Sequence, residues 1–267
     1  MQHNEGIRNK NGRKMRGRGR EILEKIRNLV EELDAEGEPQ IKFLKKAEVG
    51  GSSWIAALAA SFDPPTCAHL GLVEAARRKG ASEILVLLDK VNADKRTFGA
   101  PIEERLHLLL KLFEEDPAIS VGLSSHPLFV HKLQALRRIC PEGTRISFIV
   151  GYDTIVRILD PKYYRDRDEE LSLLFEGADF LVAPRGDRGE EDIIALFELP
   201  ENRKYRGKIE ILRVSGFEHI SATMIREKVR RGEDVRGLVP EEILADVLEI
   251  YGHEGRRDEA SARNRSR

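Results

Sequence analysis

Cysteine and long apolar segments are scarce in this chain, and each shortage excludes a class of protein. The 267 residues include two cysteines, Cys67 and Cys140, and neither lies in a metal-ligand spacing. A disulfide framework is therefore excluded, and a reducing compartment, with the cytoplasm as the default, is expected. No apolar run approaches the roughly 20 residues of a membrane span, and no hydrophobic segment follows the basic N-terminus, so neither a membrane helix nor a secretory signal is expected.

An excess of charge of one sign is also absent. Charged residues make up 34% of the chain, but the net charge is only −1. Partners that select for bulk charge, such as nucleic acid or a membrane surface, are therefore not expected. The exception is the stretch 1–20, where seven Lys or Arg residues stand against Glu5 and leave a net charge of +6.

Composition divides the chain into two polar ends and a long central part. Residues 1–18 are basic and rich in Gly and Asn, and residues 252–267 are highly charged, so both are expected to be disordered tails. Residues 19–53 are expected to form a helix at 21–34 and a connector. Residues 54–251 then form one domain.

Strands and helices are predicted to alternate through this domain. Strands are expected at 54–60, 83–88, 118–122, 145–150, 178–183 and 208–213, with a further short strand in the connector at 41–44. Helices are expected at 68–79, 101–115, 128–138, 153–159, 190–197, 221–231 and 240–251. Continuous apolar strands such as 83–88 are typical of a sheet covered on both faces. The predicted fold is α/β, a doubly wound, Rossmann-like parallel sheet, whose ligands bind beyond the carboxyl ends of the strands.

The segment Ser61-Phe-Asp-Pro-Pro-Thr-Cys-Ala-His69 falls at a strand-to-helix turn. Free backbone N–H groups and the positive end of the helix dipole at such a turn suit a phosphate. Thr66, which is also a natural N-cap, and His69 add donors for oxygens that gain charge during group transfer. Asp63 precedes a proline, so a structural role in the turn is expected for it.

A second segment, Ile220-Ser-Ala-Thr-Met-Ile-Arg226, opens a helix after the last predicted strand. Ser221 is a natural N-cap, while Thr223 and Arg226 are three residues apart and share one helix face. A hydroxyl and a guanidinium at a helix start suit an anion. Together the two segments are suited to hold a nucleoside triphosphate from both ends.

Three further sites follow predicted strands on the same side of the sheet. Gly151 lets a ribose or base approach the backbone, and Asp153 either accepts a hydrogen bond from that ligand or caps the next helix. Lys95 and Arg105 follow the strand at 83–88 and are either phosphate ligands or a solvated charged face. Arg185 follows the strand at 178–183.

These motifs resemble the nucleotidylyltransferase superfamily, with its cytidylyltransferase-like fold, and most of all the nicotinamide and nicotinate mononucleotide adenylyltransferases. The resemblance rests on 61–69, on Phe148-Ile-Val-Gly-Tyr-Asp153 and on 220–226, which keep the family order over residues 50–251. Ala59-Ala60 stands where the family usually has a Gly pair.

The first motif departs from the family at two further positions. Thr66 and Ala68 stand where His and Gly are usual, although Thr at the first of these positions is familiar in phosphopantetheine adenylyltransferases.

The resemblance implies that ATP and a mononucleotide react to give a dinucleotide, NAD or its nicotinate form, and pyrophosphate. It implies ATP contacts by Ser61, Phe62, Thr66, His69, Ser221, Thr223 and Arg226, with catalytic roles for Thr66, His69 and Arg226. It implies mononucleotide contacts by Lys95, Arg105, Gly151, Asp153 and Arg185. Mg²⁺ is implied as the companion of ATP and, because no carboxylate cluster has metal-ligand spacing, is expected on the phosphates and water.

Other functions remain open at this point. They are adenylyl transfer to phosphopantetheine, cytidylyl transfer, nucleotide binding without catalysis, and RNA binding through the basic N-terminus. A class I aminoacyl-tRNA synthetase shares the sheet and the His motif, but its Lys-Met-Ser-Lys-Ser loop is absent. The sequence leaves open the choice between nicotinamide and nicotinate, the oligomeric state, a homo-oligomer included, and the role of the tails.

Overall fold

The computed structural model describes residues 21–49, 51, 53–91, 99–214, 216–217 and 219–252. These residues form a seven-stranded sheet with the strand order β1-β4-β3-β2-β5-β6-β7. The strands are β1 (Ile41–Lys45), β2 (Trp54–Ala59), β3 (Glu83–Asp89), β4 (Ile119–Ser124), β5 (Arg145–Gly151), β6 (Asp179–Ala183) and β7 (Ile209–Ile211). All neighbours are parallel except β1, which pairs antiparallel with β4. The predicted doubly wound α/β fold is confirmed, with an antiparallel edge strand added.

Helices connect most of the strands. They are α2 (Cys67–Arg78), α3 (Ile102–Phe113), α4 (Phe129–Ile139), α5 (Tyr152–Leu159), α6 (Arg167–Gly177), α7 (Glu190–Leu196) and α8 (Ala222–Arg230), with two short 3₁₀ helices, η1 (Pro161–Tyr163) and η2 (Arg203–Lys208). Residues 21–32 and 241–252 are helical as well. The predicted strands and helices lie within two residues of these bounds.

Helix α6 is the one long element that the sequence analysis missed. It buries Leu171, Leu174 and Phe175, and Asp166 caps it by accepting a hydrogen bond from the Glu169 N–H at 3.0 Å. Leu173 lies between these residues in the sequence and is 53% exposed. This apolar residue on the outer face blurs the helical periodicity, which explains the miss.

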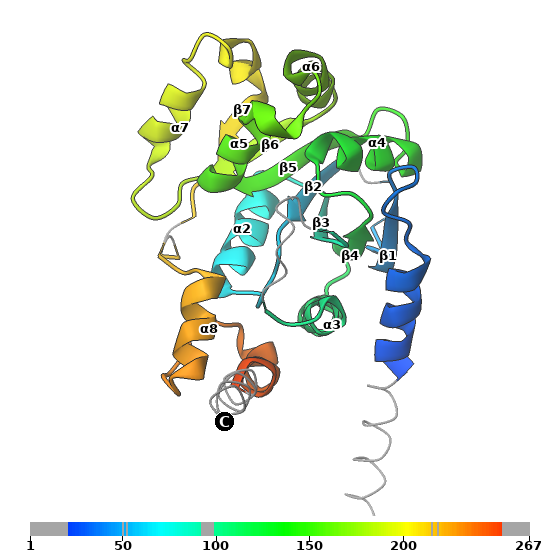
Figure 1. The fold of residues 1–267 in the computed structure, drawn as a ribbon, viewed down its shortest axis with the longest axis vertical. Helices are drawn as coiled ribbons and strands as arrows, with labels where there is room; N and C mark the ends of the chain where they lie inside the picture. Colours follow the sequence, from blue (N-terminus) through cyan, green and yellow to red (C-terminus); the bar gives the residue numbers. More distant parts are fainter. Residues whose placement is uncertain are drawn as a thin grey trace, which may run out of the picture.

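The helices cover both faces of the sheet (Figure 1). On one face, Leu85 and Leu87 of β3 pack in a core with α4, α5, α6 and α7. On the other, Ile84, Val86 and Leu88 pack in a core with α2, α3 and the helix at 21–32. Five consecutive apolar residues of β3 are therefore buried alternately on two sides, as expected for a central parallel strand.

The last two helices form a third core below the sheet (Figure 1). Leu108, on the outer side of α3, packs in one cluster with Ile225 and Val229 of α8 and with Val247 and Tyr251 of the helix at 241–252. This packing brings the start of α8 to the carboxyl end of β2.

The topology leaves a crevice beside β2. The chain runs from β2 to β3 and β4 on one side and then continues through β5, β6 and β7 on the other. Connections that leave in opposite directions open a gap at the carboxyl ends of the central strands.

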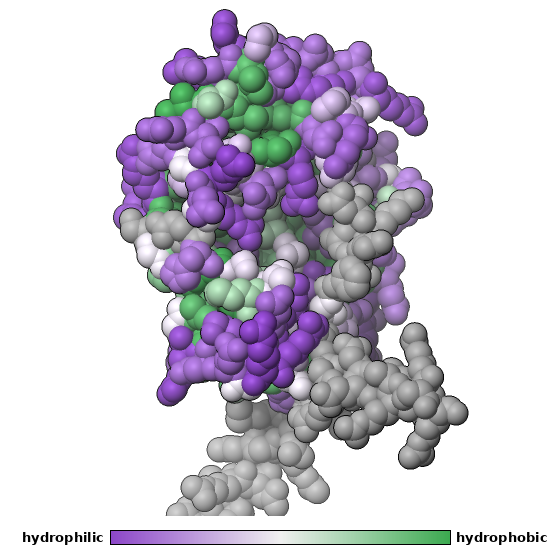
Figure 2. Space-filling model, turned by 60° about the vertical axis from the view of Figure 1, so that its left-hand side comes forward, coloured by the Kyte–Doolittle hydropathy of each residue, from purple (hydrophilic) through white to green (hydrophobic). Residues whose placement is uncertain are grey.

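The face that carries α2, α7 and α8 is mostly hydrophilic, with a hydrophobic area over its upper part (Figure 2). Ile194 in α7 and Leu199 just after it are both more than one-third exposed. Across the described ranges, every helix is too short or too polar to cross a membrane.

Candidate active site

A cavity of about 550 Å³ opens at the carboxyl ends of β2, β5 and β6, where the topology predicts a ligand. Its lining includes nine residues singled out in the sequence: Ser61, Thr66, His69, Arg105, Gly151, Arg185, Ser221, Thr223 and Arg226. The two main motifs, whose members Asp63 and Arg226 are 163 positions apart, thus open on one space.

The segment from Ser61 to His69 turns sharply from β2 into α2. Phe62 has a positive φ of 44°, and its side chain is 1% exposed. A bulky residue is strained in this region, so the surrounding packing must hold it there. The ring centroid of Phe62 lies 4.8 Å from that of His69. Phe62 is not part of the cavity lining; it supports the imidazole from the core side.

Thr66 and His69 cap the start of α2 reciprocally. Thr66 Oγ1 accepts from the His69 N–H at 3.3 Å, and His69 Nδ1 accepts from the Thr66 N–H at 3.0 Å. The same Nδ1 lies 2.9 Å from Thr66 Oγ1. Because a backbone N–H only donates, Nδ1 is the bare nitrogen, and the proton of the neutral ring lies on Nε2.

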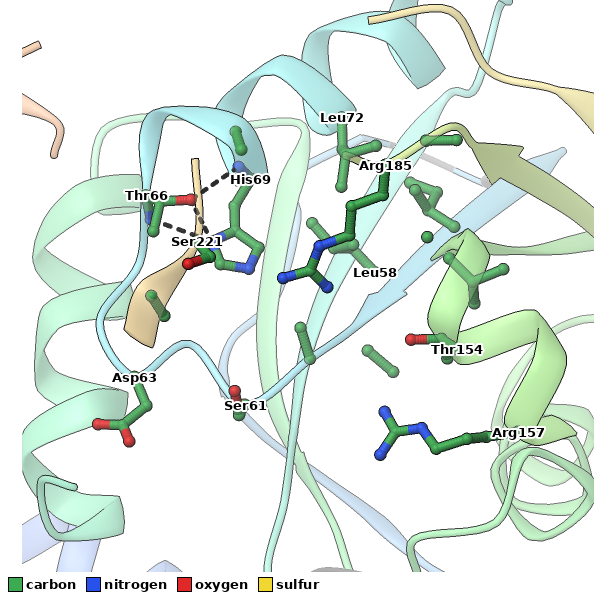
Figure 3. A pocket seen from close by; sticks show the side chains of 18 of the residues that line it. Leu58, Ser61, Asp63, Thr66, His69, Leu72, Thr154, Arg157, Arg185 and Ser221 are labelled. Atoms are coloured by element: carbon green, nitrogen blue, oxygen red, sulfur yellow. Dashed lines mark hydrogen bonds between the residues drawn. The ribbon is translucent and has the colours of Figure 1, made fainter. Parts of the chain in front are cut away.

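His69 is uncharged at neutral pH. Burial, followed by the positive charge of Arg185, lowers the pKa of His69 to about 4. The side chains of His69 and Arg185 point toward one another across the cavity (Figure 3). Together they offer an anion one neutral donor and one cation.

The sequence analysis expected the backbone N–H groups of this turn to be free for a phosphate, but three of them already donate to other parts of the protein. The Thr66 and His69 N–H groups are used within the cap, and the Cys67 N–H donates to the Leu238 carbonyl at 2.9 Å. An anion at this turn would therefore meet the side chain of His69 rather than a row of free N–H groups.

The start of α8 is tied directly to the first motif. Ser221 caps the helix by accepting from the Met224 N–H at 3.1 Å. The Arg226 side chain is 16% exposed and donates through Nη1 to the Asp63 carbonyl and through Nη2 to Thr223 Oγ1 at 3.2 Å. Nη1 also lies 3.3 Å from Asp63 Oδ2. These contacts fix the guanidinium at the edge of the cavity.

Arg105 brings a further cation, which is buried, to the cavity. It is 8% exposed, and its Nη1 donates to the Ser61 carbonyl at 2.9 Å. Its Nε is buried and has no hydrogen-bond partner in the described part of the chain. Arg105 therefore fixes the end of β2.

Three more residues, Gly151, Asp153 and Lys95, were predicted to contact the mononucleotide, and the structure does not place them alike. Gly151 ends β5 and is the N-cap of α5, so Asp153 does not cap this helix. Asp153 lies outside the cavity lining, 62% exposed, with Oδ2 3.4 Å from Arg185 Nη1. Lys95 lies outside the described residues.

The sequence analysis missed one wall of the cavity. Phe129, Tyr163 and Tyr164 line it, and Arg157 of α5 directs its guanidinium into the same space (Figure 3). Phe129 and Arg157 lie in the helices that follow the carboxyl ends of β4 and β5, and that position is a signal that could have identified them, whereas Tyr163 and Tyr164 come only after α5.

A buried ion pair lies behind this wall. Lys132 is 0% exposed; its Nζ lies 2.8 Å from Asp89 Oδ1 and donates to the carbonyls of His126 at 3.2 Å and Pro127 at 2.5 Å. Burial lowers the pKa of Lys132 and raises that of Asp89, while the opposite charges counter both shifts. Asp89 ends β3 and lines the cavity, so the pair ties the segment after β4 to the sheet.

Comparison with known protein families identifies the family of this chain. Residues 57–228 match the family model described as cytidylyltransferase-like, and the chain belongs to that family. The resemblance of the sequence to nucleotidylyltransferases is therefore confirmed.

Named relatives extend the match over most of the chain. A Schizosaccharomyces pombe protein, provisionally named nicotinamide mononucleotide adenylyltransferase, is 28% identical over 86% of this chain and 98% of its own length. An Anaeromyxobacter dehalogenans protein, provisionally named nicotinate-nucleotide adenylyltransferase, is 30% identical over 74% of this chain and 96% of its own.

A solved structure shares the fold. The Plasmodium falciparum nicotinic acid mononucleotide adenylyltransferase, complexed with NaAD, aligns with a TM-score of 0.55 and 18% identity. The alignment covers 74% of this chain and 98% of the other.

Proposed function

We propose that this protein is a nucleotidyltransferase that joins the adenylyl group of ATP to the phosphate of nicotinamide or nicotinate mononucleotide and releases pyrophosphate. The observation that carries the proposal is the meeting of the His69 turn and the Arg226 helix start at one cavity of dinucleotide scale. The names of the relatives, which specify one or the other of these two acceptors, support it.

The triphosphate lies between the two motifs in this proposal. Ser221, Thr223 and Arg226 at the start of α8 meet the outer phosphates, where a guanidinium and the helix dipole both favour negative charge. His69 and Thr66 lie at the α-phosphate, with Nε2–H of His69 directed to a phosphate oxygen. Ser61 lines the cavity beneath, and the buried Phe62 supports the His69 ring from the core side.

The acceptor lies against the wall that begins at Phe129. Tyr163, Tyr164 and Phe129 offer apolar and aromatic surface to a flat pyridine ring. Arg105, Arg157 and Arg185 lie around the same space and suit the acceptor phosphate and any further anionic group. Gly151 leaves room for a ribose. Asp153 takes part in acceptor binding through its ion pair with Arg185.

The chemistry is a single in-line displacement at the α-phosphorus. An oxygen of the acceptor phosphate forms the new bond as the bond to pyrophosphate breaks, so the protein needs no nucleophile of its own. His69 donates a hydrogen bond as charge grows on the transferring phosphoryl oxygens, and Arg226 neutralises the leaving pyrophosphate.

Mg²⁺ is proposed to enter with ATP as part of the substrate. In the described part of the chain, no group of three or more His, Cys, Asp or Glu residues could hold a metal ion. The two cavity carboxylates are also engaged, Asp63 with Arg226 and Asp89 with Lys132. This donor set fits an ion carried by phosphates and water.

The test is incubation of the purified protein with ATP and Mg²⁺ and one acceptor at a time: nicotinamide mononucleotide, nicotinate mononucleotide or phosphopantetheine. Chromatography of the product and a coupled assay for pyrophosphate should show equal amounts of dinucleotide and pyrophosphate with at least one mononucleotide. Turnover with phosphopantetheine but with neither mononucleotide would mean that phosphopantetheine is the acceptor. ATP binding without pyrophosphate release would favour a nucleotide-binding protein without catalysis.

A further inference from the structure

Tyr251 reaches the candidate site from the far end of the chain. It is 0% exposed within the helix at 241–252, and its hydroxyl donates to Asp63 Oδ1 at 2.7 Å. The two residues are 188 positions apart, and Asp63 is itself 4% exposed. Sequence analysis attached no function to Tyr251.

Asp63 stands between Tyr251 and Arg226. Its Oδ1 accepts from the Tyr251 hydroxyl and from the Ala100 N–H at 3.1 Å, and its Oδ2 lies 3.3 Å from Arg226 Nη1. A Cβ at Gly99 would lie 1.8 Å from Oδ2, so the backbone presses directly against the carboxylate. Two donors on one oxygen and this contact on the other leave the carboxylate one orientation.

The orientation of Asp63 determines what Arg226 can do. An arginine side chain has several rotatable bonds, and fixing it in one geometry costs conformational entropy at the moment of binding. Here Nη1 is held by the carbonyl and the carboxylate of Asp63, and Nη2 contacts Thr223. The guanidinium is thus held in one place at the edge of the cavity before a ligand arrives.

We propose that Tyr251 is a positioning residue for the phosphate site: its hydroxyl fixes the Asp63 carboxylate, which in turn holds Arg226 ready for the phosphates of ATP. The part concerning ATP rests on the proposed function. The part concerning Arg226 does not, because it is a property of the protein without ligand.

The test is Tyr251→Phe, which removes the hydroxyl and keeps the ring. Loss of one hydrogen bond behind Arg226 should weaken Mg·ATP binding by about 3- to 10-fold, measured by calorimetric titration, and raise the KM for ATP by a similar factor. The KM for the mononucleotide should change less than about 2-fold on the same reasoning. The matched control is Tyr205→Phe, since Tyr205 is also a buried tyrosine and lies outside the cavity lining.

A double-mutant cycle separates positioning from general stability. In an Arg226→Ala background, Tyr251→Phe should cause no further loss of ATP affinity, because the group that it positions is gone. An equal loss with and without Arg226, or a lowered melting temperature with parental ATP affinity, would overturn the proposal.

Two further measurements cover the cases in which Tyr251→Phe does not fold or ATP is not the ligand. Asp63→Asn, which keeps an acceptor for Tyr251 but removes the charge beside Arg226, should cause the same selective loss of ATP affinity. The Nε–H resonance of Arg226, followed by NMR without ligand, should shift and broaden in Tyr251→Phe or Asp63→Asn. An unchanged resonance would disprove the positioning role, whereas a changed resonance in a protein that does not bind ATP would disprove only the proposed function.

Discussion

His69 and Arg185 face one another across the cavity, and burial of the imidazole followed by the charge of Arg185 lowers the pKa of His69 to about 4. Because Nδ1 accepts from the Thr66 N–H, the neutral ring presents its proton on Nε2. The pair thus supplies a hydrogen-bond donor that stays uncharged around neutral pH.

The first prediction concerns the charge of Arg185. Arg185→Gln should raise the pKa of His69 while leaving it below the ordinary value, because burial is the larger cause. The measurement is an NMR titration of the imidazole carbons in the protein without ligand. Arg157→Gln, which removes another cavity cation that is not a cause of the His69 shift, is the control. An unchanged pKa in Arg185→Gln would show that this charge does not reach His69.

The lowered pKa of His69 also makes the stability of the folded protein depend on pH. The pKa of His69 is lower in the folded protein than in the unfolded chain, so the unfolded state binds more protons between pH 6.5 and about 4. The contribution of His69 to stability is complete above pH 6.5 and falls as the pH drops through this window. Urea denaturation at several pH values should show a smaller loss in Arg185→Gln than in the parent.

The second prediction concerns catalysis by His69. His69→Ala should lower kcat by roughly 10²- to 10³-fold with a much smaller change in the KM for ATP, as when one transition-state donor is removed. Thr66→Val should lower kcat less, because the Thr66 N–H still holds Nδ1 of His69, but it should cost about 1 kcal/mol through the lost N-cap. Steady-state kinetics and melting temperatures measure both. A near-parental kcat in His69→Ala would leave the motif as a binding feature only.

The third prediction concerns the geometry of Arg226. Its two terminal nitrogens contact Asp63 and Thr223, and a lysine cannot reproduce this fork. Arg226→Lys should therefore raise the KM for ATP by roughly 10-fold and change the KM for the mononucleotide little. Titration with Mg·ATP in the absence of acceptor is the direct measurement. Equal losses for both substrates would remove Arg226 from the triphosphate site.

The sequence was a good guide to whatever depends on local pattern. Apolar runs located the strands, and Pro64-Pro65 with Thr66 located the turn into α2. It was a poor guide to contacts between distant residues: Tyr251 and Asp63 meet only because α8 and the last helix share a core with α3. Backbone donors were also misjudged, since the partner of the Cys67 N–H is Leu238, far along the chain.

Lys132 illustrates the same limit for charge. A lysine in the middle of a helical pattern is usually a solvated residue, yet this side chain is fully buried. Its partners are Asp89 at the end of another strand and two carbonyls in the segment before α4. The carbonyls are close to Lys132 in the sequence, but no spacing links it to Asp89, so only the fold could reveal the ion pair.

The last prediction tests whether this ion pair supports the acceptor wall. Lys132→Met keeps the length of the side chain but leaves Asp89 without its cation and the carbonyls of His126 and Pro127 without their donor. Breaking a buried pair should cost about 3 kcal/mol, toward the low end of the usual range because the Asp89 side chain keeps some exposure. The KM for the mononucleotide should rise while the KM for ATP stays near the parental value, because Phe129 follows the released segment and the ATP motifs lie elsewhere.

The double variant Lys132→Met with Asp89→Leu distinguishes the two effects of the substitution. It removes the unpaired carboxylate, so stability measured by urea denaturation should recover in part. The KM for the mononucleotide should stay high, because the two carbonyls still lack the donor that ties them to the sheet. Recovery of both quantities would mean that the wall keeps its shape without Lys132, and that the pair contributes to folding alone.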